Sequence, residues 1–428
     1  MNVKSLTSLI SLVLVFPLIY LVYSVIGLNF DNFIYLWNNL LLDYSLNTLY
    51  LVFLTVFFSL ILGIIPAWFI STTKFKGKNF FDIVLFLPLS IPSYIIAFTY
   101  SDILSYTGPI QSYFRNFLPD LYKYVNLDYL QIEILAFLMA LVLYPYLYTA
   151  CRISFSLLGS NYINIAKNLG MSQFQTFFKI IIPISRVSIF SGLFLIVMEV
   201  LNEYGAVKYF GVNTFTSGIF RSWYSMEDIN TASILAVCLL VTVSIFFILE
   251  RYSSSKFKYN YKPNDSTSGN YSTNKFSRVL IYSICLFPFI LGFLIPVTFI
   301  INNVFKTINN IDFNELINLS FNSFFLASIS SIIIVLIAIF FQFIKKISRS
   351  KTIFFLSEIV SLTYAMPGAV IALSLILLLS FLSKIFGISI IFGSVAILVY
   401  AYVMRYMAVG ISPLRSSFEK HPDSFDDT

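Results

Sequence analysis

The sequence predicts an all-α integral membrane protein, and two observations carry this prediction. Of the 428 residues, 58% are hydrophobic and only 11% are charged, whereas a soluble domain has about 25% charged residues. The apolar residues also gather in runs of about 20 or more, the length at which a helix crosses a bilayer. Ten such spans are expected, at 8–28, 46–70, 83–105, 131–150, 187–205, 231–250, 277–302, 320–344, 354–382 and 388–409.

Basic residues alternate between the loops of this predicted ten-span chain. Six of the 27 Lys and Arg residues lie in one set of loops, and the others lie in the alternate loops or near the ends of the chain. Cytoplasmic loops carry the excess of positive charge, so both termini are expected in the cytoplasm of a cell with a multi-pass inner membrane. The net charge of +7 then reflects membrane topology, and no clustered patch indicates nucleic-acid binding.

Several kinds of chemistry are excluded by residue counts. The three cysteines, Cys151, Cys238 and Cys285, have unrelated spacings and fit small buried side chains better than a metal site or a disulfide framework. The single histidine, His421, cannot form a zinc or iron enzyme site without cysteine partners. No Gly-rich phosphate-binding loop is present, so the chain is not expected to bind ATP itself. No metal, cofactor or catalytic residue is predicted.

Two features recur in the chain at one fixed offset. The segment Ser45-Leu46-Asn47-Thr48 precedes one span and Ser320-Phe321-Asn322-Ser323 precedes another, 275 residues later. Pro92 and Pro367 lie within the spans that follow, again 275 residues apart. A constant offset indicates a duplicated unit of six spans.

The duplication divides the chain into three parts. Residues 1–250 form a complete unit of six spans, and residues 251–276 are polar and read as a cytoplasmic linker. Residues 277–428 form a second unit with four spans, and comparison with the first unit leaves it about 85 residues short.

The loop after the fourth span is expected to contact a cytoplasmic partner. Ser160 or Asn161 could cap a short helix that Gly170 ends. A second helical stretch from Phe174 then leads to Pro183 and the fifth span. A short helix lying flat at the membrane surface could pass motion from a partner to the spans.

This loop resembles the coupling loop of permeases of binding-protein-dependent ABC importers. The family pattern is Glu-Ala-Ala, three residues, Gly, nine residues, Ile, one residue, Leu-Pro, with Asn here in place of Glu and Ile in place of the first Ala. In that family the loop forms a helix that inserts into the ATPase subunit. The matching residues are Asn164, Ile165, Ala166, Gly170, Ile180, Ile182 and Pro183. At the end of the chain Asp427 would take the Glu position of a second, incomplete loop.

Residues 198–225 resemble the corresponding segment of fused, two-unit ferric-iron permeases. Glu203-Tyr204-Gly205-Ala206-Val207, Tyr209-Phe210-Gly211-Val212 and the segment 214–219 carry this resemblance. A carboxylate inside a span is costly and tends to face a cavity or a partner. The predicted translocation path therefore contains Glu199, Asn202, Glu203, Tyr204 and Gly205. A purely structural role for Glu199 explains its position equally well.

The resemblance implies a fold of two tandem six-helix units of the type I ABC importer permease. It also implies a non-catalytic membrane subunit that works with two copies of an ATP-binding subunit and an extracytoplasmic substrate-binding protein. Ferric iron is the expected cargo, and thiamine, phosphonate or polyamine permeases share the architecture. An ion-gradient-driven secondary transporter is the alternative from another class, and it would need no ATPase.

Overall fold

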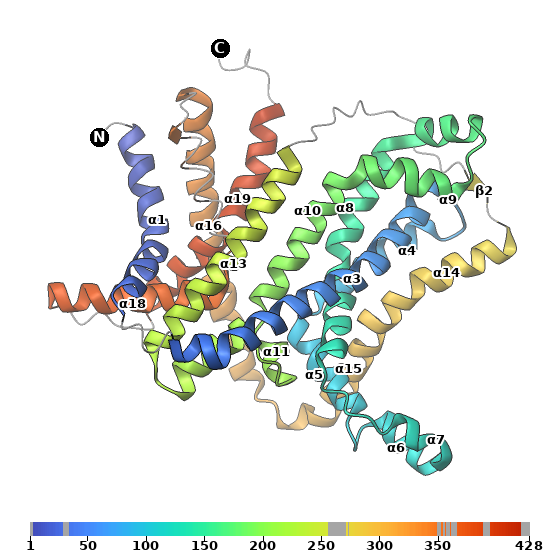
Figure 1. Cartoon of the computed structure of the whole chain (residues 1–428), viewed down its shortest axis with the longest axis horizontal. Helices are drawn as coiled ribbons and strands as arrows, with labels where there is room; N and C mark the ends of the chain where they lie inside the picture. The colour runs from blue at the N-terminus through green and yellow to red at the C-terminus, as the bar shows by residue number, and fades with distance from the viewer. Residues whose placement is uncertain are drawn as a thin grey trace. The chain divides into compact units, whose positions relative to one another are not determined.

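The computed structural model describes residues 3–28, 34–255, 271–272, 274–348, 352–353, 356, 360, 366–387 and 394–420. Within these residues the chain is helical except for loops and one pair of two-residue strands, as Figure 1 shows. Strands β1 (Thr73–Lys74) and β2 (Tyr271–Ser272) pair in parallel, with Thr73 opposite Tyr271. The all-α prediction is therefore confirmed. His421, Asp427 and most of the predicted linker lie outside the described residues.

The long helices are continuous through most of the predicted spans. Their bounds are α1 (Val3–Ile26), α3 (Leu42–Thr72), α8 (Ile132–Asn168), α10 (Ile182–Asn202), α13 (Ile229–Ser255), α14 (Lys275–Phe289), α15 (Ile295–Thr307), α16 (Phe313–Ser348), α18 (Gly368–Phe386) and α19 (Val395–Lys420). Shorter helices lie between them: α4 (Lys78–Val84), α5 (Ser93–Leu104), α6 (Pro109–Phe117), α7 (Pro119–Val125), α9 (Gln173–Thr176), α11 (Gly205–Tyr209) and α12 (Phe215–Phe220). Two 3₁₀ turns, η2 (Leu87–Ser90) and η6 (Ile308–Asn310), complete the short elements.

Four π-helical turns interrupt or join these helices. They are η1 (Trp37–Leu41), η3 (Phe177–Ile181), η4 (Arg221–Ser225) and η5 (Ile290–Leu294). Two of them directly precede helices with proline in the first turn, α10 with Pro183 and α15 with Pro296. Proline has no N–H to donate and crowds the preceding turn, so a wide turn is a reasonable local solution there.

The described part of the chain contains eight helical stretches that are long and apolar enough to cross a membrane. They correspond to the predicted spans except the third and the tenth. The third span is a pair of helical segments, Lys78–Ser90 and Ser93–Phe117, bent by 88°. The tenth corresponds to a shorter apolar helix, Val395–Ile411. Counting the bent pair as one span gives nine, so the predicted number of ten is not reached.

Packing divides the chain into two compact units. The larger unit contains residues 39–217 and 245–308, and the smaller unit contains residues 1–38, 218–244 and 309–428. The predicted division of the sequence near residue 250 follows a different criterion, internal duplication, and it stays a prediction.

Helix α8 is the central element of the larger unit. Tyr144, Tyr148 and Cys151 on this helix are buried, and both α3 and α10 pack against it. Glycine permits these close crossings, because a Cβ on Gly192 would lie 2.9 Å from the Cα of Leu147. A Cβ on Gly63 would likewise lie 3.2 Å from the Cβ of Leu147.

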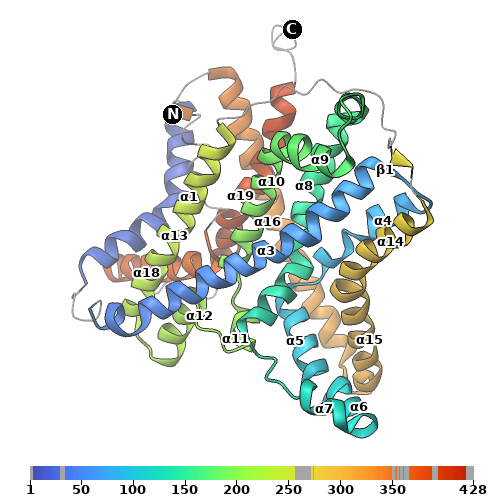
Figure 2. The same cartoon turned by 45° about the vertical axis from the view of Figure 1, so that its right-hand side comes forward.

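Helices α14 and α15 also belong to the larger unit, where they contact α4, α5 and α8 or their flanking turns. The ring of Tyr282 stacks on Phe81 at 5.5 Å, and the hydroxyl of Tyr100 donates a hydrogen bond to the Leu291 carbonyl at 2.7 Å. The first helix of the predicted second half thus packs on helices of the predicted first half (Figure 2).

The smaller unit shows the reciprocal arrangement. Helix α1, from the predicted first half, packs on α18, from the predicted second half, and the rings of Tyr20 and Phe381 lie 4.9 Å apart. The hydroxyl of Tyr400 on α19 also donates to the Val13 carbonyl of α1. Helices α16 and α19 form the rest of the packing in this unit.

The two proline breaks have nearly the same backbone geometry. Pro92 precedes α5 with φ −60° and ψ 144°, and Pro367 precedes α18 with φ −58° and ψ 141°. The same offset of 275 residues thus relates two helix starts as well as two sequence motifs. A duplicated chain would have this property.

Candidate coupling and translocation sites

The predicted coupling loop forms a helical elbow between α8 and α10. The expectation of a separate short helix beginning near residue 160 is wrong, because α8 continues without a break to Asn168. Gly159 is the single glycine in its cytoplasmic half, and one glycine is tolerated inside a helix.

The helix ends where the sequence predicts, at Gly170. This residue has φ +72°, a conformation that glycine adopts without strain. The N–H of Met171 donates to the Ala166 carbonyl at 2.9 Å, which closes the helix end. Ser172 then caps α9 through a capping box with Gln175, so the chain enters the next helix after a short turn.

The seven predicted coupling residues all lie on this elbow. Asn164 and Ile165 are exposed near the end of α8, whereas Ala166 is fully buried. Ile180 lies in η3, and Ile182 and Pro183 begin α10. An aromatic cluster that the sequence did not reveal holds η3 in place, since the ring of Phe177 lies 5.1 Å from that of Trp68.

Exposed apolar side chains cover the outside of the elbow. They are Tyr162, Ile165, Leu169, Phe174 and Phe178, and we call this set the elbow face. Leu169 is 71% exposed and Phe174 is 73% exposed. A contiguous apolar patch of this kind marks an interaction surface more often than a chance exposure.

Three polar side chains join α8 to α4 below the elbow. Tyr144, Tyr148 and Arg152 are four residues apart and therefore share one face of α8. The hydroxyl of Tyr144 donates to the Leu85 carbonyl and that of Tyr148 to Asp82 Oδ1, both at 2.7 Å. Arg152 forms an ion pair with the other oxygen of Asp82. We call these contacts the α8–α4 ladder.

The third predicted span is bent rather than straight, and prolines explain the bend. Pro88 lies in the 3₁₀ turn η2, and Pro92 precedes α5 with an extended backbone. The residue before a proline is disfavoured in the helical conformation, so Ile91 leaves the helix as well. The prediction of a bend at Pro92 is confirmed.

A second break lies directly against this bend. Helix α10 ends at Asn202, and α11 begins at Gly205. The carboxylate of Glu203 accepts a hydrogen bond from the Ala206 N–H at 2.9 Å and another from the Ser93 side chain. A Cβ on Gly205 would lie 2.8 Å from the Cβ of Tyr94, so only glycine fits there. We call this contact between the two breaks the break junction.

The remaining predicted path residues have separate environments. The Asn202 amide donates to the Met198 carbonyl of its own helix at 3.0 Å. The ring of Tyr204 lies under the Lys208 ammonium at 5.5 Å. Glu199 is half-buried on α10. The structure therefore brings Glu203 and Gly205 to the break junction, and the common path through all five residues stays a prediction.

Residues 59–259 contain the elbow, the ladder and the break junction. These residues match the profile of the family described as binding-protein-dependent transport system inner membrane component. This part of the chain belongs to that family, so the chain is a transport permease of the binding-protein-dependent class, and the resemblance found in its sequence is confirmed.

Particular relatives carry different cargo names. The chain is 24% identical to the Fe(3+)-transport system permease protein FbpB 2 of Haemophilus influenzae over 391 residues, which are 89% of this chain and 71% of that protein. It is 25% identical to the molybdenum transport system permease protein ModB of Azotobacter vinelandii, over 49% of this chain and 92% of ModB. It is also 25% identical to the sulfate transport system permease protein CysT of Salmonella typhimurium, over 39% of this chain and 57% of CysT.

Proposed function

We propose that the chain moves ferric iron across the bacterial inner membrane, as the membrane subunit of an importer whose ATP-binding subunits are separate. Two copies of that subunit would contact the permease, and an extracytoplasmic binding protein would deliver the iron. The elbow is the observation that carries this proposal, since it combines the family's Gly and Pro spacing with an exposed apolar face.

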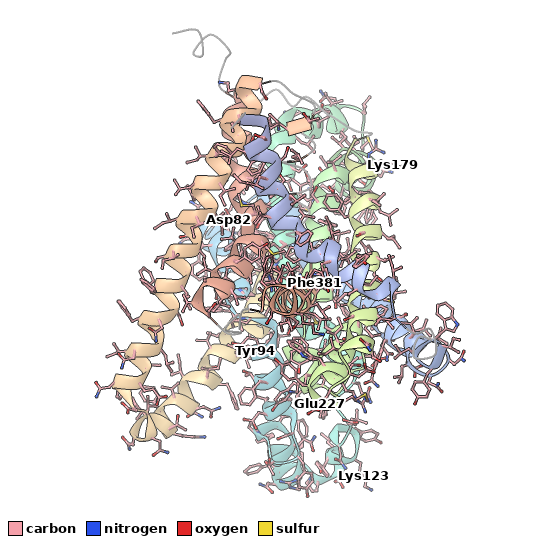
Figure 3. The ribbon with its side chains drawn as sticks, turned by 90° about the vertical axis from the view of Figure 1, so that its left-hand side faces the viewer. Asp82, Tyr94, Lys123, Lys179, Glu227 and Phe381 are labelled. Carbon is pink, nitrogen blue, oxygen red and sulfur yellow. The ribbon has the colours of Figure 1, made fainter. Side chains whose placement is uncertain are left out.

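The orientation of the elbow is part of the proposal. Figure 3 shows Lys179 of the elbow and Lys123 of α7 at opposite ends of the larger unit. The distribution of Lys and Arg favours the elbow end as the cytoplasmic one. An ATP-binding subunit would then reach the elbow face, and a binding protein would meet the end that carries α6 and α7.

The tandem arrangement of two permease units is proposed on the same footing. The reciprocal packing of α1 on α18 and of α14–α15 on helices of the first half supports it. So does the relative ModB, nearly all of which aligns with about half of this chain.

The geometry of the larger unit supports a mechanical role for the elbow. Helix α8 has 37 residues, which corresponds to about 55 Å at 1.5 Å per residue. Its elbow end and its ladder lie on one uninterrupted helix, so a movement of the elbow would also move Asp82 on α4. Through η2 and Pro92 the same movement would reach the break junction, where the chain changes direction twice.

Iron is favoured over the other cargoes named by the relatives. The iron permease aligns with most of the chain, whereas the sulfate and molybdenum permeases align with half or less. Sulfate and molybdate are oxyanions, and the carboxylate of Glu203 at the break junction suits a cation better. Thiamine, phosphonate and polyamine import remain alternatives, as does transport driven by an ion gradient.

Crosslinking tests the proposed ATP-binding partner. A cysteine in place of Ile165, which is 54% exposed, is expected to crosslink to a cysteine on the ATP-binding subunit in the assembled complex. The neighbouring Ala166→Cys variant is the matched control and should react far less, because Ala166 is fully buried. If Ile165→Cys is instead labelled by a membrane-impermeant thiol reagent from outside intact cells, the proposed orientation is wrong.

A single amide substitution tests the role of the Glu203 charge. Glu203→Gln keeps the oxygen that accepts from Ala206 but removes the negative charge. We expect ATP-driven iron uptake to fall about tenfold or more, since about 1.4 kcal/mol of lost transition-state stabilisation has that effect. Uptake of radioactive iron into proteoliposomes is the measurement, with Glu199→Gln compared in parallel. Unchanged uptake by Glu203→Gln would exclude a role for the charge in passage.

A further inference from the structure

A polar cavity lies at the end of the larger unit opposite the elbow. Its volume is about 450 Å³, and it is lined by the end of α5, by the start of α6, by residues 126–130 and by Tyr209. In Figures 1 and 2, α6 and α7 lie at the opposite end of the larger unit from α9. We call this space the α6 cavity.

Gln111 gives the α6 cavity an unused hydrogen-bond acceptor. The residue lines the cavity although it is only 4% exposed. Its amide nitrogen donates to the Leu104 carbonyl at 2.8 Å, but its carbonyl oxygen Oε1 has no partner. Leaving a buried acceptor unsatisfied costs about 1–3 kcal/mol. A ligand that brings a donor or a positive charge would remove this cost.

The charged groups lining the cavity are both acidic. They are Asp102 at the end of α5 and Asp128 in the following loop. Asp128 Oδ1 accepts from the Leu130 N–H at 3.0 Å, which fixes the direction of this carboxylate. The nearby Arg115 is not in the lining and lies over the Tyr106 ring at 4.3 Å. The cavity therefore carries a net negative charge.

Neutral oxygens complete the lining. The hydroxyls of Tyr106, Tyr129 and Tyr209 belong to it. Burial raises the pKa of Tyr129, so this group is a neutral phenol at ordinary pH. Carboxylate, amide and hydroxyl oxygens are ligands for hard cations, and thiolate or imidazole ligands are absent from the lining.

We propose that the α6 cavity binds a small hydrated multivalent cation, held by Asp102, Asp128 and Gln111 Oε1. Within the described residues no three His, Cys, Asp or Glu side chains come together as a metal site. The cation would therefore keep part of its water shell, bind weakly and exchange quickly. Such a site suits a cation in transit at the mouth of a permease, and to that extent its biological role rests on the proposed import of iron.

Terbium luminescence tests the site without any transport. The probe is Tb³⁺, a hard trivalent cation, added to the full chain in lipid nanodiscs while tyrosine is excited. We expect saturable sensitised emission, because three tyrosines line the cavity. The double variant Asp102→Asn/Asp128→Asn should bind Tb³⁺ about tenfold or more weakly, and Gln111→Leu about threefold more weakly. Asp120→Asn is the control, since Asp120 lies on α7 outside the lining and should leave binding unchanged.

The outcomes separate the site from the transport function. Absence of saturable emission, or equal affinity in the double variant and the parent chain, would overturn the proposed site. Size-exclusion chromatography of each variant would show that it remains folded. Iron uptake into proteoliposomes is measured with the same variants. Uptake without Tb³⁺ binding would refute the site alone, and binding without any ATP-driven uptake would refute the transport function alone.

Discussion

Replacing Arg152 with glutamate is expected to reduce ATP-driven uptake about tenfold or more, and the exchange Asp82→Arg/Arg152→Glu is expected to restore part of it. Arg152 and Asp82 form an ion pair whose side chains are 40% and 23% exposed, respectively. Two carboxylates in this place would repel each other and separate α4 from α8. Removing one partner of a fully buried pair costs about 3–5 kcal/mol, and the partial exposure here lowers that figure.

The control for this prediction is Lys76→Glu. Lys76 is exposed in the turn before α4, and the substitution makes the same change of charge. Uptake and the amount of protein in the membrane are measured for all variants. Full activity of Arg152→Glu, or failure of the exchange variant to exceed the single variants, would show that the ladder does not link elbow movement to the bent span.

Leu169→Asp is expected to reduce ATP-driven uptake about 100-fold while leaving the amount of folded permease unchanged. Leu169 belongs to the elbow face and is 71% exposed, so the folded chain loses little by the substitution. If the side chain is buried against an ATP-binding subunit, a carboxylate there is desolvated without a partner. Central apolar anchors of an interface account for 2 kcal/mol or more, which is about 30-fold, and a buried charge adds to this loss.

Asn168→Asp introduces the same charge one residue earlier and is the matched control. Asn168 is already polar and exposed at the end of α8, so this variant should keep most of its activity. ATP hydrolysis by the complex is measured beside uptake. Normal uptake by Leu169→Asp would mean that the elbow face does not contact the partner, and equal loss in both variants would assign the effect to charge rather than to an apolar contact.

Features that depend on neighbouring residues were predictable from the sequence. Apolar runs placed the spans, because a bilayer demands about 20 apolar residues in a row. Gly170 indicated a helix end, and the positive φ of this residue confirms the prediction. Pro92 indicated a bend, since a proline cannot complete the helical hydrogen bonds. In each case the physical cause lies within a few residues of the effect.

Features that depend on distant residues were missed. Asp82 and Arg152 are 70 residues apart, and only the packing of α4 on α8 brings them together. A lone acid in the apolar segment FFDIVLF and a lone arginine at the end of the fourth span were the available signals. The continuation of α8 to Asn168 was missed because Ser160 and Asn161 favour helix starts as a class, yet both lie inside α8 here. The unsatisfied oxygen of Gln111 has no sequence signal at all.

The packing of α1 on α18 affects how the protein is made. Helix α1 leaves the ribosome first, but the segment Gly368–Phe386 that it packs against is synthesised near the end of translation. During elongation α1 must therefore remain in the lipid as a solitary helix, which is stable because its own backbone hydrogen bonds are satisfied. A contact between such distant segments forms late and slowly. Assembly of the smaller unit should thus begin only when most of the polypeptide is already inserted, and nascent chains should be vulnerable to membrane proteases until then.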